Sequence, residues 1–476
     1  MPDKTKSTPE RIYLIGICGT AMASLAYLLK AAGYTVTGSD AGIYPPMSTY
    51  LKQNGIRLLQ GYDPANLQPR PDLVVVGNAI SRGNVELERT LETKIPYASL
   101  PETLRLRFLP GRTSVVVSGT HGKTTTASAL AWAFSELGED PSFLIGGIPA
   151  GLGGGARLGQ GRWFVLEGDE YDTAYFDKAP KFFHYRPDLL VVNNVEYDHA
   201  DIYPDLESIL LQFRRLVNMV PRSGLIVYGG DCPNARAVTA RALCPTVSVG
   251  LSEGCDWRVE VPGADVDGTR LRVYRRGEDL GELRTPLHGD HNVRNLAAAA
   301  AVLDHAGFAW DRVAGALSSF AGVERRMTLR AEVGDVLIYD DFAHHPTAIR
   351  ETLAGVRRRF PGRRVWAVFE PRSWTCRKKV HQEAMPAAFA GADGVILAEV
   401  FRKEQLPEAD RFRPEIAVEA LNASGGRAYY IPDGDAIADF LSRETRPGDV
   451  VVVMSNGGFD DIHRKLAERM RTNHDA

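Results

Sequence analysis

A glycine-rich stretch, VVVSGTHGKTTT at 115–126, has the residue types and spacing of a phosphate-binding loop. We expect an apolar strand to end at Val117 and a helix to begin near Lys123, with two glycines curling the backbone between them. Backbone N–H groups at such a helix N-terminus bind anions, the lysine amine reaches the β- and γ-phosphates, and the Thr124 hydroxyl can hold Mg²⁺. The usual P-loop pattern has glycine where Val117 stands, so this loop is a shortened variant, and a plain glycine turn with a surface lysine is the alternative. The predicted nucleotide-binding residues of the loop are Gly119, Thr120, His121, Gly122, Lys123, Thr124 and Thr125.

Carboxylates follow two later strands. The segment RWFVLEGDEYD ends a strand at Glu167, with further acids just beyond, and DLLVVNNVEYDHADIY ends in a polar loop that contains His199. Mg²⁺ prefers a few protein oxygens, and a carboxylate at the end of a strand beside the phosphate loop is well placed to hold it. We therefore predict Thr124, Glu167 and His199 as metal ligands. A solvated or capping histidine is the alternative for His199.

Two further clusters suggest ligand contacts. Asn292 and Asn295 lie three residues apart and share one face at the start of an Ala-rich helix, although helix capping would also explain them. The segments ERRMTL and IYDDFAHHP bring Arg326, Asp341, His344 and His345 close to a domain joint, where a ligand could be bound between domains. Charged residues at a linker are more often solvated than functional, so this cluster alone is only weak support for a ligand site.

The N-terminal segment IGICGTAMASLAYLLKAAGYTVTGSD is similar to a dinucleotide fingerprint. Gly16 and Gly19 are present, the third glycine is absent, and Asp40 ends the next strand about 20 residues on. This pattern is a weak indication of NAD binding. It is a better indication that some other nucleotide pyrophosphate binds at the helix N-terminus. The predicted residues of this site are Gly16, Cys18, Gly19, Thr20, Asp40 and Asn78.

The elements that position these residues alternate between short apolar strands and longer helical patterns, which predicts an α/β fold with mostly parallel sheets. Chain breaks at RFLPGRTS and SSFAGVERRM divide the 476 residues into three predicted domains, 1–110, 111–323 and 324–476. Strand-like patches without a helical period, roughly 245–290, indicate an antiparallel appendage on the middle domain.

Composition narrows the class of function. The chain has 44% hydrophobic and 24% charged residues and a net charge of -3, so it lacks a global basic field for holding nucleic acid. Its five cysteines show no paired spacing typical of zinc or redox sites, and no stretch reaches the ~18 to 20 apolar residues of a membrane span. We expect a cytoplasmic protein without nucleic-acid or membrane partners.

Taken together, GTHGKTTT, EGDEYD, NNVEYDHADIY, HGDHNVRN, VERRM and DDFAHHP follow the motif order of the Mur ligases, the ATP-dependent amide-forming enzymes of peptidoglycan synthesis, and the resemblance covers essentially the whole chain. It implies a Rossmann-like domain that binds a UDP-sugar, a central P-loop ATPase-type domain and a Rossmann-like C-terminal domain. It also implies that Lys123 contacts the phosphates, that Thr124 and Glu167 hold one Mg²⁺, and that His199 helps to hold a second. Asn292 would lie near ATP, with Arg326 and Asp341 reaching it from the last domain.

Within this family, some members bridge their metals with a carbamoylated lysine, but Phe213 stands at the matching position. The segments YPPMST, FEPRSW and MSNGGF resemble the branch that joins the tripeptide L-Ala-γ-D-Glu-meso-diaminopimelate to UDP-N-acetylmuramate. Arg372 and Arg377 are then candidates for binding a substrate carboxylate, with a solvated basic loop as an equal alternative. An L-alanine-adding ligase, an NAD-dependent oxidoreductase and a non-catalytic nucleotide-binding scaffold are the rival functions.

Overall fold

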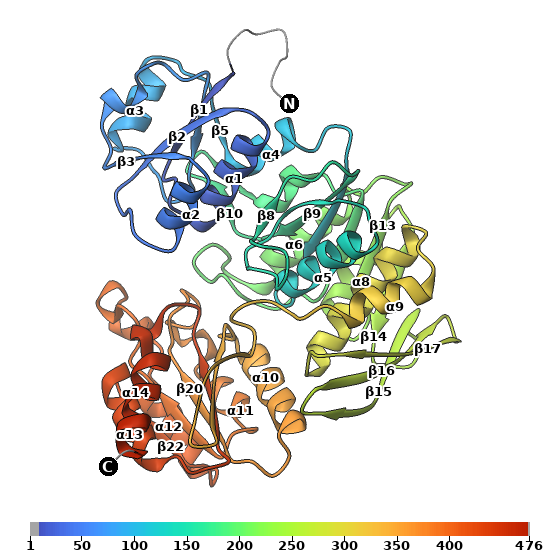
Figure 1. Cartoon of the computed structure of the whole chain (residues 1–476), viewed down its shortest axis with the longest axis vertical. Helices are drawn as coiled ribbons and strands as arrows, with labels where there is room; N and C mark the ends of the chain where they lie inside the picture. Colours follow the sequence, from blue (N-terminus) through green and yellow to red (C-terminus); the bar gives the residue numbers. More distant parts are fainter. Residues whose placement is uncertain (1–8, 475–476) are drawn as a thin grey trace.

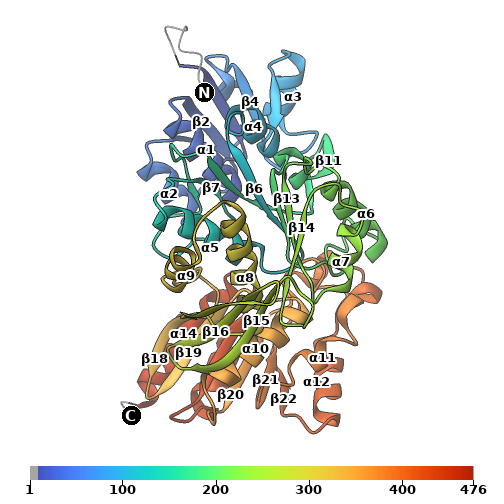
Figure 2. The ribbon, with the colours of Figure 1, turned by 90° about the vertical axis from the view of Figure 1, so that its right-hand side faces the viewer.

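The computed structural model describes residues 9–474, and these contain three large successive β-sheets with helices packed around them, together with one two-stranded sheet (Figure 1). The N-terminal, central and C-terminal parts follow one another along the long axis of the molecule, and both views show this arrangement (Figure 2). Most neighbouring strands are parallel. The predicted α/β class is therefore confirmed. Among the described helices, none combines the length and apolar character that a membrane crossing needs.

The N-terminal sheet has the order β3-β2-β1-β4-β5, and all its strand pairs are parallel. The buried strand β4, LVVV, shows the continuous apolar run expected of a parallel strand covered on both faces. The elements are β1 (Arg11–Ile15), α1 (Thr20–Ala31), β2 (Thr35–Asp40), α2 (Met47–Gln53), β3 (Arg57–Gln60), η1 (Pro64–Leu67), β4 (Leu73–Val76), α3 (Val85–Glu92), β5 (Tyr97–Ser99) and α4 (Leu100–Arg107).

The central sheet has ten strands in the order β17-β16-β15-β14-β13-β12-β6-β9-β7-β8. Strands β15, β16 and β17 pair antiparallel, so the predicted antiparallel appendage is present. The strands are β6 (Thr113–Ser118), β7 (Ser142–Leu144), β8 (Ala156–Arg157), β9 (Trp163–Gly168), β12 (Leu189–Val192), β13 (Leu225–Gly229), β14 (Thr246–Gly250), β15 (Trp257–Asp265), β16 (Gly268–Arg275) and β17 (Glu278–Thr285), with the hairpin β10 (Asp172–Ala174) and β11 (Asp177–Pro180) beside them. The helices are α5 (Lys123–Glu136), η2 (Lys181–Tyr185), α6 (Leu206–Val217), α7 (Pro233–Thr239), α8 (Asp290–His305) and α9 (Trp310–Ser318).

The C-terminal sheet has the order β18-β19-β23-β20-β21-β22, and only β18 among its strands runs antiparallel to its neighbour. Separate apolar clusters cover its two faces, as a doubly wound sheet requires. The main elements are β18 (Thr328–Val333), β19 (Val336–Asp341), α10 (Pro346–Arg359), β20 (Val365–Phe369), α11 (Met385–Ala388), β21 (Gly394–Leu397), α12 (Pro414–Ala423), β22 (Ala428–Tyr430), α13 (Gly434–Glu444), β23 (Val450–Met454) and α14 (Ile462–His474). Short helical turns are η3 (Lys379–His381), η4 (Lys403–Gln405), η5 (Glu408–Asp410) and η6 (Phe459–Asp461).

Strand order brings the chemistry-bearing loops to one place. Strand β6 lies between β12 and β9, and its last residue, Ser118, pairs with both Val192 and Gly168. Because these strands are parallel, the segments that follow them leave the same edge of the sheet. Helix α10 packs across this region against α8 and β15, which brings the C-terminal domain over that edge (Figure 2).

Candidate active site

A cavity of about 1080 Å³ lies between the central and C-terminal domains, and Asn78 of the N-terminal domain also lines it. Its wall joins segments that are far apart in sequence, as expected for a ligand site at a domain interface. The predicted residues that line it are Asn78, Thr120, His121, Gly122, Lys123, Thr124, Thr125, Glu167, His199, Asn292, Asn295, Arg326 and Asp341.

The phosphate loop between β6 and α5 is held in shape by a left-handed glycine and by the loop after β12. Gly122 caps α5 with φ 80°, and a Cβ atom there would approach Asn193 Nδ2 to 2.8 Å and clash with the side chain of Asn295. The backbone N–H of His121 donates to Asn194 Oδ1 at 2.8 Å. The shortened loop therefore curls at the N-terminus of α5 without the leading glycine.

Lys123 extends from the first turn of α5 into a buried, acidic pocket. Its Nζ donates to the Gly119 carbonyl at 2.7 Å and lies 2.9 Å from Glu170 Oε2. Burial opposes its ionisation, but the charges of Glu170 and Asp169 outweigh that effect and raise the pKa of Lys123. The amine is a fixed positive charge beside the loop.

Glu167, at the end of β9, accepts a hydrogen bond from the Thr124 hydroxyl at 2.7 Å and another from the Gly146 amide at 2.6 Å. Burial and the nearby charge of Asp169 raise the pKa of Glu167. A divalent cation would relieve this crowding of carboxylates, and a hydroxyl beside a carboxylate suits the oxygen preference of Mg²⁺. Thr124 and Glu167 thus fit the predicted metal site.

Glu170 is a central member of the site that sequence reasoning did not select, although it noted an acid there. Its side chain is 3% exposed, and its Oε1 lies 3.3 Å from His199 Nε2 and 3.2 Å from Lys123 Nζ. Despite burial, Lys123 and His199 lower the pKa of Glu170 to about 2. In return, Glu170 outweighs burial and raises the pKa of His199 to about 9. A solvated or capping histidine is therefore the wrong description of His199.

The paired asparagines lie on the first turns of α8, but they do not cap it. The cap residue is Gly289, with φ 91°. Asn292 Nδ2 donates to the His288 carbonyl at 2.8 Å, and Asn295 Nδ2 donates to Asn292 Oδ1 at 3.3 Å. Both side chains face the cavity, so the capping explanation is wrong.

A strained turn in the linker before β18 presents Arg326 to the cavity. Its neighbours Arg325 and Met327 both have positive φ, 59° and 51°. Asp341, at the end of β19, accepts from the amides of Met327 and Ala343, each at 2.8 Å. Burial raises the pKa of Asp341, while Arg326 opposes this shift. With 4% exposure, Asp341 is not the solvated linker charge considered as an alternative.

The glycine loop after β1 lies outside this cavity. Asp40 accepts hydrogen bonds from the backbone amides of Cys18 at 2.9 Å and Gly42 at 3.0 Å, so it holds the loop. Of the residues predicted to bind the UDP-sugar, Asn78 lines the cavity and donates to Asp172 at 3.4 Å. The ligand roles of the loop residues stay predictions.

The two arginines of the PRSWTCR segment differ in their surroundings. Arg377 is 5% exposed, and its Nη2 donates to the Arg402 carbonyl at 2.8 Å. The Arg372 guanidinium stacks on the Phe401 ring at 3.8 Å. Trp374, between them, lines the cavity, whereas neither arginine does. A solvated basic loop does not describe Arg377, and the carboxylate-binding role of both residues stays a prediction.

Comparisons with known proteins identify the family. The N-terminal residues 11–106 match the Mur ligase family catalytic domain, residues 117–303 match the Mur ligase middle domain, and residues 325–457 match the Mur ligase glutamate ligase domain. The chain is also 42% identical, over 96% of its length and 98% of the relative, to the UDP-N-acetylmuramate--L-alanyl-γ-D-glutamyl-meso-2,6-diaminoheptandioate ligase of Escherichia coli K12. The chain belongs to the Mur ligase family.

This Mur ligase is similar to solved structures as well. A murein peptide ligase from Psychrobacter arcticus superposes with a TM-score of 0.72 and 38% identity, covering 97% of this chain and 98% of the other. The UDP-N-acetylmuramate--L-alanine ligase of Desulfitobacterium hafniense is 31% identical over 96% of this chain and 99% of the relative. Phe213, at the position matched to a metal-bridging lysine, is fully buried with its ring 5.6 Å from that of Phe182, so it belongs to the core.

Proposed function

We propose that this Mur ligase joins the tripeptide L-Ala-γ-D-Glu-meso-diaminopimelate to UDP-N-acetylmuramate at the expense of ATP, in the recycling of cell-wall peptide. The observation that carries the proposal is the higher identity to the peptide-adding relative, 42%, than to the L-alanine-adding one, 31%, over comparable lengths. Trp374 supports it, because this exposed aromatic lines the cavity and belongs to the FEPRSW segment, which resembles that of the peptide-adding branch. Since the reaction consumes ATP and a nucleotide sugar, we expect it to take place in the cytoplasm.

The reaction has two steps. An oxygen of the muramoyl carboxylate attacks the γ-phosphorus of ATP, the bond to the β-phosphate oxygen breaks, and ADP leaves an acyl phosphate behind. The peptide amine then attacks the acyl carbon, the carbon–oxygen bond to phosphate breaks, and the amine loses its proton as the amide forms. Both steps bring anions or polar groups together in the cavity, so positioning and charge compensation are the main tasks of the protein.

The residues of the cavity divide these tasks. The loop amides ending at Gly122 cradle the phosphates, and Lys123 exchanges its contact with Glu170 for the β- and γ-phosphates. Arg326 and Asp341 complete the site from the C-terminal domain. The ion pair of Arg294 with Glu351, 3.2 Å apart, joins the two domains. Closure of the domains over the cavity would keep water from the acyl phosphate.

Magnesium fits the acidic side of this cavity. Thr124 and Glu167 would hold one ion, and His199 with Glu170 would contribute to a second. Bound there, Mg²⁺ would offset the negative charge of the phosphates. His199 has to lose a proton before it can act as a ligand, so its pKa of about 9 predicts tighter metal binding at higher pH.

A substrate competition assay tests the proposal. Purified protein receives ATP, Mg²⁺ and UDP-N-acetylmuramate with either the tripeptide or free L-alanine, and phosphate release is measured. We expect turnover with the tripeptide and little with L-alanine. Turnover with L-alanine alone would assign the chain to the other branch, and turnover with neither would contradict both.

A further inference from the structure

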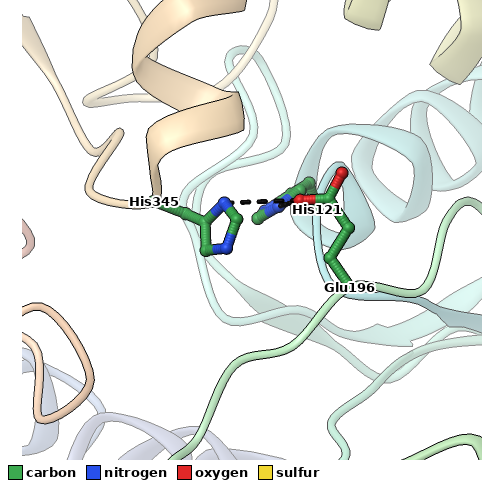
Figure 3. Close-up of side chains that lie close together, drawn as sticks. All are labelled: His121, Glu196 and His345. Atoms are coloured by element: carbon green, nitrogen blue, oxygen red, sulfur yellow. Dashed lines mark hydrogen bonds and ion pairs between the residues drawn. The ribbon is translucent and has the colours of Figure 1, made fainter. Parts of the chain in front are cut away.

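Two histidines and a glutamate meet where the central and C-terminal domains touch (Figure 3). His121 belongs to the phosphate loop, Glu196 follows β12, and His345 precedes α10. Glu196 Oε2 lies 3.2 Å from His121 Nε2 and 3.4 Å from His345 Nδ1, and the three ligand atoms lie within 4.8 Å of one another. The amide-forming reaction proposed above does not need a contact between Glu196 and either histidine.

The hydrogen bond from Thr347 to His345 indicates that Nδ1 of His345, the nitrogen that faces Glu196, carries no proton. His345 Nδ1 accepts the backbone N–H of Thr347 at 3.3 Å as the cap of α10, so Nδ1 carries a lone pair. That lone pair also faces the carboxylate oxygen of Glu196. His345 is buried and Glu196 is partly exposed. Two lone-pair atoms this close repel each other, and a cation between them would turn the repulsion into binding.

The spacing suits a small transition-metal ion. Zinc bonds of about 2.0 to 2.2 Å to nitrogen and oxygen place the ligands of a tetrahedral site about 3.3 Å apart. The distances from Glu196 Oε2 to the two imidazole nitrogens, 3.2 and 3.4 Å, bracket this value. Two imidazoles and one carboxylate favour zinc and its neighbours over magnesium, which prefers oxygen.

We propose that His121, Glu196 and His345 form a site for a zinc-like divalent cation, separate from the magnesium site at Glu167. His121 and Glu196 line the large cavity, so the fourth ligand position opens toward it and takes water or a phosphate oxygen. The ion has to compete with the Thr347 amide for Nδ1, which predicts moderate rather than extreme affinity.

Such an ion links the two domains. His121 and Glu196 belong to the central domain and His345 to the C-terminal domain, so bound metal would hold the phosphate loop against α10. His381 packs its ring 4.7 Å from that of His345, and its buried Nε2 lacks a hydrogen-bond partner among residues 9–474. We therefore expect the cation to favour the closed arrangement of the domains.

The test uses metal alone. Metal-free protein is titrated with Co²⁺, whose visible absorption reports tetrahedral coordination, and with Zn²⁺ by calorimetry. We expect a tetrahedral Co²⁺ band in the wild type, lost in Glu196→Gln and in His345→Asn, where asparagine still caps α10. Because loss of outer contacts already costs 10–100-fold, removal of a ligand should weaken Zn²⁺ binding by at least about 100-fold.

Two control variants separate this site from others. His184→Gln alters a histidine that pairs with Asp177 in the β10–β11 hairpin, and His199→Gln removes a ligand of the proposed magnesium site; both should keep the Co²⁺ band. Zn²⁺ should also raise the Tm of the wild type but not of His345→Asn, and a cooperative transition without metal shows that the variant folds. A wild type without the band, a band that survives Glu196→Gln and His345→Asn, or a band lost in His199→Gln would overturn the proposal.

Discussion

The carboxylate of Glu170 lies 3.3 Å from the imidazole of His199, and this contact controls the charge of the histidine. Burial disfavours the imidazolium, yet Glu170 raises the pKa of His199 to about 9, well above the ordinary 6.5. A pKa raised on folding adds stability that is fully present below pH 6.5 and is lost as the pH rises through 9.

Replacing Glu170 with glutamine should reverse this shift. Without the carboxylate, burial dominates, so we expect the pKa of His199 in Glu170→Gln to fall to or below 6.5. NMR titration of the histidine ring resonances measures it directly, with His184, which pairs with Asp177, as an internal control that should not move. An unchanged pKa near 9 would contradict the assigned role of Glu170.

The proposed catalytic role of Lys123 and its ion pair with Glu170 can be separated by two variants. Lys123→Ala should lower kcat/KM by roughly 100- to 1000-fold, because it removes charge stabilisation from the phosphoryl group. It also leaves Glu170, 3% exposed, without its closest cation, which should cost about 3–5 kcal/mol of stability.

The double variant Lys123→Ala/Glu170→Gln should recover most of this stability but none of the activity. Urea unfolding measures the first property and phosphate release the second. If the double variant regained turnover, the activity loss of Lys123→Ala would be a folding effect and the phosphate role of the lysine would be wrong.

The sequence predicted those parts of the site that depend on short-range patterns. A strand, two glycines and a helix in direct succession define the loop before Lys123, and Glu167 ends a strand that pairs with the strand before the loop. The loop and the end of the strand at Glu167 are readable because each depends on neighbouring residues, whereas the pairing of the two strands is a long-range contact. Parallel sheets and the antiparallel appendage followed from the same periodicities.

Other parts of the site depend on contacts that spacing does not encode. Arg326 reaches the cavity from a turn in which Arg325 and Met327 adopt positive φ. Positive φ is uncommon for residues other than glycine, so the sequence does not predict this turn. Asp40 occupies the position of a ribose-binding acid, but its oxygens accept hydrogen bonds from the amides of Cys18, in the loop after β1, and of Gly42. Glu170 gains its importance from Lys123, 47 residues away in the chain.

Two glycines of the central domain form a matched pair for testing the phosphate loop. Gly122 and Gly138 flank α5 with φ of 80° and 87°, but a Cβ atom meets Asn193 and Asn295 at Gly122 and nothing within 4 Å at Gly138. Gly138→Ala should therefore cost only the backbone strain, about 1 kcal/mol. Gly122→Ala should cost about 1–3 kcal/mol more and abolish ATP binding. Thermal unfolding and ATP calorimetry on both variants check this, and equal effects would show that the loop tolerates a side chain.

Trp374 offers a test of where the peptide binds. Its side chain lines the cavity and is 38% exposed, with the Arg377 guanidinium 4.9 Å from the ring centre. Covering such a ring with substrate is worth about 1.5–3 kcal/mol, so Trp374→Ala should raise the KM for the tripeptide by roughly 10- to 100-fold. The KM for ATP should change less than about twofold, because the tryptophan lies on a different segment from the phosphate loop.

Trp374→Phe, which keeps an aromatic surface, should recover most of the affinity for the tripeptide, and Leu243→Ala, at a residue 65% exposed outside the cavity lining, should change neither KM. Steady-state kinetics with each substrate varied in turn supply these values. A parallel rise in both KM values would indicate that Trp374 supports domain closure instead of contacting the peptide. Unchanged kinetics in Trp374→Ala would place the peptide on another wall of the cavity.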